Sequence, residues 1–414
     1  MTTSDALAVL LLQITVILVV AKLTAAAVNR AGQPAVVGEM LGGILLGPSF
    51  FGWLFPAAHR AIFPEDAIGA LQLLSQIGVI LFMFLVGCEL DLARVTRNAR
   101  TAVVVSYTGI AVPMLLGIAL AWLIFRDFAP AGVRFLPFGL FVGTAMSITA
   151  FPVLARILAE RRLTHTVLGA TAIACAAVDD VSAWCILSVV VAVAKASGVS
   201  GAAVTIVMVV IFAVVMLAMI RPLVGRAAGN ERWSGDGAFA AALIFAFVSA
   251  FVTEAIGVHA IFGAFLAGVV VSANTSVRAL VEDRVHALAS AMLVPLFFAS
   301  AGLRTELSLV AGPRSWLVCA AILLVAIAGK LGGGSLAARW TGMSWRDSLA
   351  LGALMNTRGL MELIVLNVGY DLGILSPALF SMMVLMALVT TGMTAPMLGA
   401  LRGTMTTAEV RSAT

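Results

Sequence analysis

Charged residues are scarce in this chain, and their scarcity excludes most classes of soluble protein. Only 11% of the 414 residues are Asp, Glu, Lys or Arg, against about 25% in soluble domains. Hydrophobic residues make up 62% of the sequence, and the mean hydropathy is +1.11. Apolar runs of about 20 residues, the length that crosses a bilayer core, recur from end to end. We therefore expect a polytopic membrane protein in one domain, 1–414, without a soluble regulatory domain.

Cysteine and histidine are also rare, with four of each. Cys88, Cys175, Cys185 and Cys319 lie in or at the ends of apolar runs without paired spacing, which disfavours disulfides and metal sites. The histidines are scattered over predicted loops and helix ends, without metal-ligand spacing. We expect no cofactor. The net charge of +5 is explained by membrane topology, so nucleic acid is not an expected partner.

The apolar runs are too long and continuous for barrel strands, and lipid accepts only helices or closed barrels. We predict an all-α membrane protein with about 13 transmembrane helices. The first run follows MTTSD, without the basic segment of a cleaved signal peptide, and is expected to be retained. The predicted helices lie near residues 6–28, 34–48, 68–88, 101–124, 136–158, 166–194, 202–220, 237–253, 258–273, 286–302, 316–338, 349–369 and 376–400.

Lysine and arginine are unevenly distributed between alternate loops, which supports an odd number of spans. With the N-terminus outside and the C-terminus in the cytoplasm, most of them lie inside, as the positive-inside rule requires. We predict this orientation in the inner membrane of the cell. The predicted outside segments carry only Arg60, Arg126, Arg134, Lys195, Arg304 and Arg314.

Two adjacent acids, Asp179 and Asp180, lie in the middle of the run 166–194. A carboxylate near the bilayer centre costs roughly 2.5–3.5 kcal/mol on insertion scales, so we expect this pair to bind a cation or a proton. Lys330 lies well inside the run 316–338 and needs a partner of its own. Because neighbours on a helix point about 100° apart, one aspartate can pair with Lys330 while the other faces a wet cavity. Snorkelling of Lys330 to the interface is the alternative.

Two predicted helices contain features that break helices near mid-depth. In 136–158, Pro152 removes a backbone donor, so the helix is expected to unwind near Thr149. In 349–369, a polar run interrupts the apolar pattern, and an ordinary kink is the alternative in each case. Paired discontinuous helices are typical of transporters with inverted repeats. The polar run consists of Asn356, Thr357, Arg358 and Gly359.

The order of these motifs resembles the monovalent cation:proton antiporter-2 family, which belongs with the sodium/proton exchangers. The resemblance covers nearly the whole chain. It implies the sodium/proton antiporter fold with two crossing discontinuous helices, and a homodimer in which a mobile core, about 68–194 and 286–400, moves beside a scaffold. The segments that carry it, besides the Lys330 segment, are GEMLGGILLGPSFFG (38–52), LFMFLVGCELDL (81–92), SITAFPVLARIL (147–158), AAVDDVSAW (176–184), GAFLAGVVV (263–271), VPLFFASAGLRTEL (294–307) and NTRGLMELIVLNVG (356–369).

The resemblance also implies roles for single residues. Asp180 matches the carboxylate that binds a monovalent cation or a proton, and Asp179 matches the acid that pairs with Lys330. The paired aspartates imply electrogenic exchange. Glu362 can also neutralise Arg358 at i, i+4. The residues expected to line or support the crossing are Thr149, Pro152, Asn356, Thr357, Arg358 and Glu362.

The predicted function is secondary active antiport of Na+ or K+ against protons by alternating access, not enzymatic catalysis. A solute or organic-anion symporter on the same fold is one alternative, although two carboxylates repel an anion. A channel-like K+ efflux protein is another. An intramembrane aspartyl protease is disfavoured because its two acids would lie on separate helices. The sequence leaves the choice between Na+ and K+ open.

Overall fold

The computed structural model describes residues 3–89, 99–163, 166–195, 199–226 and 235–402. All regular structure in these ranges is helical, as predicted. The α-helices are α1 (Thr3–Arg30), α2 (Ala35–Leu46), α3 (Phe51–Leu54), α4 (Pro56–Ile62), α5 (Glu65–Glu89), α7 (Ala99–Phe128), α8 (Phe135–Ser147), α9 (Phe151–Glu160), α10 (Val167–Lys195), α11 (Val199–Val214), α12 (Arg221–Arg226), α13 (Asp236–Ile256), α14 (Ala260–Val271), α15 (Thr275–Leu288), α16 (Val294–Leu303), α17 (Gly312–Ile327), α18 (Gly333–Trp340), α19 (Trp345–Met355), α20 (Leu360–Asp371) and α21 (Pro377–Arg402).

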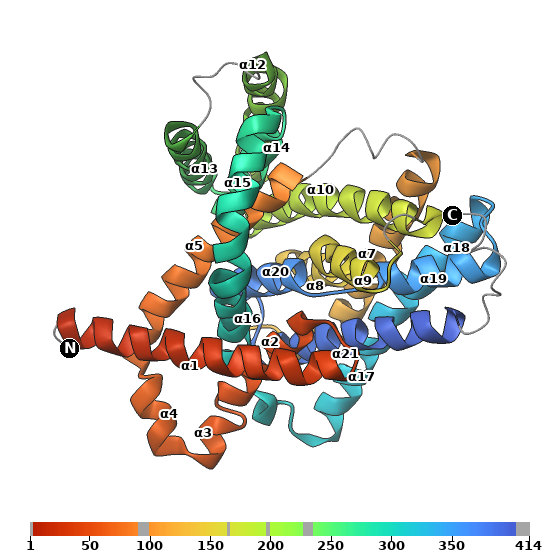
Figure 1. Ribbon diagram of the computed structural model, residues 1–414. Helices are drawn as coiled ribbons and strands as arrows, with labels where there is room; N and C mark the ends of the chain where they lie inside the picture. The colour runs from red at the N-terminus through yellow and green to blue at the C-terminus, as the bar shows by residue number, and fades with distance from the viewer. Residues whose placement is uncertain (1–2, 90–98, 164–165, 196–198, 227–234, 403–414) are drawn as a thin grey trace. The chain divides into compact units, whose positions relative to one another are not determined.

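Short π and 3-10 segments join or follow several of the α-helices labelled in Figure 1. The π segments η2 (Val215–Ile220), η4 (Ala289–Leu293) and η6 (Ala328–Gly332) each continue the preceding α-helix into the next one. The 3-10 segment is η5 (Leu307–Leu309). Because π turns inside α-helices occur frequently at functional sites, these three segments are places to look for function.

Ten helical segments among the described residues are long and apolar enough to cross a membrane. The prediction of 13 spans is not confirmed by this measure. Two of the remaining predicted spans, 136–158 and 349–369, are each divided into two helices that are too short to qualify. The third, 258–273, corresponds to α14, which has 12 residues.

The chain divides into two compact units. Unit 1 comprises Met1–Thr24, Glu39–Leu92 and Trp184–Glu306, and unit 2 comprises Ala25–Gly38, Ala93–Ala183 and Leu307–Thr414. In unit 1, α14 packs against α5 and α13. The contact with α5 is close because a Cβ on Gly268 would lie only 2.8 Å from the Cys88 amide nitrogen. The predicted site residues lie in unit 2, where α8 packs against α7 and α20, and α19 packs against α18 and α21.

Two helices of unit 2 are discontinuous, as the sequence predicted. Between α8 and α9 the chain is extended, with φ −80° and ψ 140° at Ile148. Pro152 is the second residue of α9, where its missing N–H removes no helical hydrogen bond. Between α19 and α20, Gly359 has φ +155°, a conformation that residues with a Cβ rarely adopt. The two breaks meet, since the Ala150 N–H donates to the Thr357 carbonyl at 3.0 Å.

Candidate functional site

The predicted site residues are gathered in the interior of unit 2. Those whose side chains are described are at most 1% exposed, although most of them are charged. Burial on this scale requires that each charge find a partner or be neutralised, because an isolated buried ion is strongly unfavourable. The buried residues are Thr149, Asp179, Asp180, Lys330, Asn356, Thr357, Arg358 and Glu362.

Lys330 pairs with Asp179 and is fully buried, so its side chain does not extend to the membrane surface. Its Nζ lies 2.8 Å from Asp179 Oδ2 and 2.8 Å from Thr149 Oγ1. The Thr149 hydroxyl lies 2.7 Å from Asp179 Oδ2 and 2.9 Å from the Met355 carbonyl. With one hydrogen, the hydroxyl can donate to only one of these acceptors at a time, while it accepts from Lys330. The ion pair is thereby tied to both broken helices.

A π turn places Lys330 in this contact. The segment η6, which carries the lysine, continues α17 into α18 without a break. It packs against α7. A Cβ on Gly329 would lie 2.6 Å from Pro113 Cβ, so only glycine allows this close approach. The glycine beside Lys330 therefore has a packing reason that the sequence pattern did not reveal.

Asp180 contrasts with its neighbour. It is 0% exposed, and neither carboxylate oxygen has a hydrogen bond of good geometry to any described group. The backbone amide of Phe151, at the N-terminus of α9, lies near this carboxyl. Asp179 has one open position as well, Oδ1. A buried carboxylate with free lone pairs is prepared to accept a proton or a cation.

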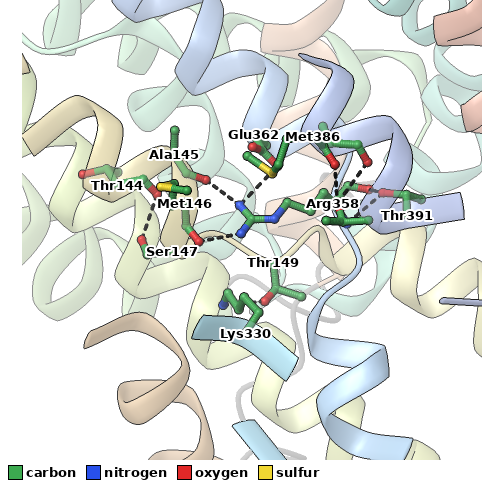
Figure 2. A network of polar contacts seen from close by, with 12 residues as sticks. Thr144, Ala145, Met146, Ser147, Thr149, Lys330, Arg358, Glu362, Met386 and Thr391 are labelled. Atoms are coloured by element: carbon green, nitrogen blue, oxygen red, sulfur yellow. Dashed lines mark hydrogen bonds and ion pairs between the residues drawn. The ribbon is translucent and has the colours of Figure 1, made fainter. Parts of the chain in front are cut away.

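Arg358, at the second break, binds the C-terminal end of α8, which belongs to the first broken helix (Figure 2). Its Nη1 donates to the Ala145 carbonyl and its Nη2 to the Met146 carbonyl, both at 2.6 Å. Nη1 also lies 3.3 Å from Glu362 Oε2. Because a helix C-terminus carries a partial negative charge, the guanidinium compensates α8 as well as Glu362. The expected pairing at i, i+4 is present, and the contact with α8 was not anticipated.

The Thr391 hydroxyl of α21 fixes the backbone between α19 and α20 by two hydrogen bonds. The Arg358 N–H donates to Thr391 Oγ1 at 3.0 Å, and the Thr391 hydroxyl donates to the Arg358 carbonyl at 2.7 Å. Thr357 Oγ1 lies 3.5 Å from Thr394 Oγ1. Sequence reasoning missed these threonines. Their spacing in the apolar helix α21, with Thr390, Thr391 and Thr394 on neighbouring turns, was the available signal.

Comparison with known proteins shows the family of the chain. The family model described as "Sodium/hydrogen exchanger, transmembrane" matches residues 15–401. The chain belongs to the sodium/hydrogen exchanger family. This is a family of membrane transporters, so the chain is a multi-pass membrane protein and not an enzyme.

Two relatives and one solved structure are similar to this exchanger over nearly its whole length. It is 40% identical over 398 residues to the Na(+)/H(+) antiporter NhaS4 of Synechocystis, covering 95% of this chain and 97% of that one. It is 34% identical over 405 residues to K(+)/H(+) antiporter 1 of Saccharomyces cerevisiae, covering 95% of this chain but 46% of the yeast protein. The solved sodium proton antiporter MjNhaP1 of Methanocaldococcus jannaschii matches with a TM-score of 0.65 at 15% identity, covering 96% and 97% of the two chains. That structure supports the predicted antiporter fold.

Proposed function

We propose that this exchanger is a secondary active antiporter that carries Na+ or K+ in exchange for protons, with Asp180 as the carboxylate that binds either. The observation that carries the proposal is the environment of Asp180. It is fully buried in unit 2, and neither of its carboxylate oxygens has a hydrogen-bond partner among the described residues. Relatives named as Na(+)/H(+) and K(+)/H(+) antiporters support the substrate class.

Charge balance around the crossing favours a monovalent ion. Asp179 is compensated by Lys330, and Glu362 by Arg358. Asp180 is then the one carboxylate of this buried group without a cationic partner at ion-pair distance. A single proton or a single monovalent cation restores neutrality, and binding of one excludes the other. Competition of this kind, together with a change in access, is sufficient for exchange.

Further parts of the proposal come from the family resemblance. We propose that exchange is electrogenic, which requires a second proton-binding group besides Asp180, because one proton against one monovalent cation moves no net charge. We also propose that the protein is a homodimer and that it lies in the inner membrane with its N-terminus outside. The division into a mobile core, about 68–194 and 286–400, and a scaffold stays a prediction. An organic-anion symporter is disfavoured because an anion would meet the uncompensated Asp180 carboxylate.

The decisive experiment is reconstitution into liposomes with an imposed pH gradient. Proton movement is followed while Na+, K+, Rb+ and Li+ are supplied in turn, with an impermeant cation as the control. Saturable proton movement driven by one of these ions is expected, and Asp180→Asn should abolish it. Asp127→Asn, the same change in a partly exposed ion pair with Arg314, should retain it. Robust exchange by Asp180→Asn would overturn the role of Asp180, and cation flux without proton movement would indicate a channel.

A further inference from the structure

Asn356 is a buried amide without partners. It is 0% exposed, and neither its Oδ1 nor its Nδ2 forms a hydrogen bond within the described part of the chain. Leaving a buried polar group unpaired costs about 1–3 kcal/mol. Such a group in a native structure requires an explanation, commonly a bound water or ion.

The backbone on both sides of Asn356 is fixed at the crossing of the two broken helices. The preceding carbonyl, of Met355, accepts from the Thr149 hydroxyl at 2.9 Å. The following carbonyl, of Thr357, accepts from the Ala150 N–H at 3.0 Å. The Asn356 N–H itself is satisfied by the Gly352 carbonyl at 3.0 Å. The side chain of Asn356 therefore has unfilled hydrogen-bonding positions at a point where the neighbouring backbone is fixed.

Asp180 meets the same crossing from α10. The backbone donor that acts on its carboxyl is the Phe151 amide, and Phe151 directly follows Ala150, which bonds to Thr357. Asn356 directly precedes Thr357. Phe151 and Asn356 are thus the chain neighbours of the two residues that share this backbone hydrogen bond, and the side-chain oxygens of both Asp180 and Asn356 have no hydrogen-bond partner among the described residues.

Neighbouring polar groups do not explain the open amide. The Thr357 hydroxyl lies 3.5 Å from Thr394 Oγ1, and both backbone groups of Arg358 are bonded to Thr391. Lys330 is engaged by Asp179 and Thr149. The atoms left without a hydrogen-bond partner beside the crossing include two nitrogens, Arg358 Nε and Asn356 Nδ2, and the oxygens of Asp180 and Asn356. Oxygens of this kind are the ligands that alkali cations take in proteins.

We propose that Asn356 Oδ1 coordinates the monovalent cation that Asp180 binds, either directly or through a water that the ion retains. This proposal rests on the antiport function proposed above. A neutral amide adds an oxygen ligand without changing the charge balance that selects a monovalent ion. A proton needs no ligand beyond the carboxylate. Asn356 consequently distinguishes the two exchanged ions, because it contributes to cation binding and not to proton binding.

The test compares Asn356→Leu with Asn367→Leu in proteoliposomes. Asn367 makes a matched control because it lies on α20 and its Nδ2 donates to the Leu363 carbonyl of its own helix at 2.8 Å. Initial rates of proton movement are measured against Na+ and K+ concentration. The apparent KM for the cation should rise at least about tenfold in Asn356→Leu, while the maximal rate at saturating cation stays within about twofold of wild type. The control should change neither quantity.

The outcomes separate this proposal from the function on which it rests. If the wild type shows no cation-driven proton movement, antiport itself is wrong. If the wild type exchanges and Asn356→Leu keeps the wild-type KM for every cation, Asn356 is not a ligand. A fall in maximal rate with unchanged KM would also overturn the proposal, since it indicates a structural role. Should Asn356→Leu fail to fold, Asn356→Ala replaces it, because alanine also lacks a side-chain oxygen, and a wild-type KM in that variant refutes the proposal equally.

Discussion

Replacement of Arg358 by leucine should destabilise the protein severely. The arginine is 0% exposed and makes hydrogen bonds of 2.6 Å to the Ala145 and Met146 carbonyls besides its 3.3 Å ion pair with Glu362. Leucine fills part of the volume but donates no hydrogen bond. Glu362 then loses its ion-pair partner, and the end of α8 loses the cation that compensates it.

The magnitude follows from these contacts. Removing one partner of a buried ion pair costs about 3–5 kcal/mol, and a hydrogen bond from a charged group contributes about 1.5–3 kcal/mol. Contributions within one network do not add fully, so we expect a loss of about 5 kcal/mol, near the upper limit for single substitutions. The double variant Arg358→Leu/Glu362→Leu removes the orphaned carboxylate as well. It should recover about 3 kcal/mol of this loss.

The assay is the free energy of unfolding of the purified protein in detergent, obtained by denaturant titration. Arg314→Leu provides the control, because the Arg314–Asp127 pair has side chains that are 76% and 36% exposed. Such surface pairs contribute about 0–1 kcal/mol. The expected order of stability is wild type and Arg314→Leu, then the double variant, then Arg358→Leu. The reasoning is refuted if Arg358→Leu is no less stable than Arg314→Leu, or if the second substitution restores nothing.

Three further changes test other parts of the structure. Thr149→Val removes one of the two acceptors of Lys330, so it should cost about 1–3 kcal/mol of stability and slow proton movement in vesicles. Thr149→Ser should retain wild-type stability and rate, and equal behaviour of the two variants would contradict this. Gly359→Ala should cost about 1–3 kcal/mol, measured by thermal unfolding, because φ is +155° and the new Cβ would lie 2.8 Å from a side-chain atom of α9. Gly399→Ala, where nothing lies within 4 Å, should cost far less. Burial lowers the pKa of His59, so the folded state takes up a proton less readily than the unfolded chain, and stability should fall as pH drops below the ordinary histidine value of about 6.5. His59→Phe should reduce that pH dependence of the thermal midpoint, and an unchanged slope would count against the assignment.

Hydrophobic length and the position of charge predicted much of the fold. The long apolar runs mark the helices because a bilayer requires about 20 such residues for each span. Charge inside those runs marked the buried residues of unit 2, since a membrane core excludes ions without partners. Asp179, Lys330 and Arg358 were identified in this way, and each is at most 1% exposed.

Contacts that depend on the crossing itself could not be predicted. The hydrogen bonds from Arg358 to the end of α8 require the spatial approach of segments that are far apart in the chain. The two hydrogen bonds of Thr391 have the same origin, since a threonine in an apolar helix more often bonds to its own backbone. The π turn at Lys330 also leaves no clear mark, because its sequence, AGKLG, is compatible with an ordinary α-helix.

The ends of the half-helices explain why the crossing needs so many polar groups. Each break exposes a C-terminus with a partial negative charge and an N-terminus with a partial positive charge. Arg358 faces the end of α8, and Glu362 lies in the first turn of α20. The Thr149 hydroxyl reaches the last carbonyl of α19, and Asp180 interacts with the first amide of α9. Three of these groups are held by further partners at hydrogen-bond or ion-pair distance, whereas the Asp180 oxygens are open. Binding of either ion at Asp180 would remove a negative charge at the start of α9, while the other three groups keep their partners, and this makes α9 the half-helix whose position is most directly coupled to occupancy of the proposed site.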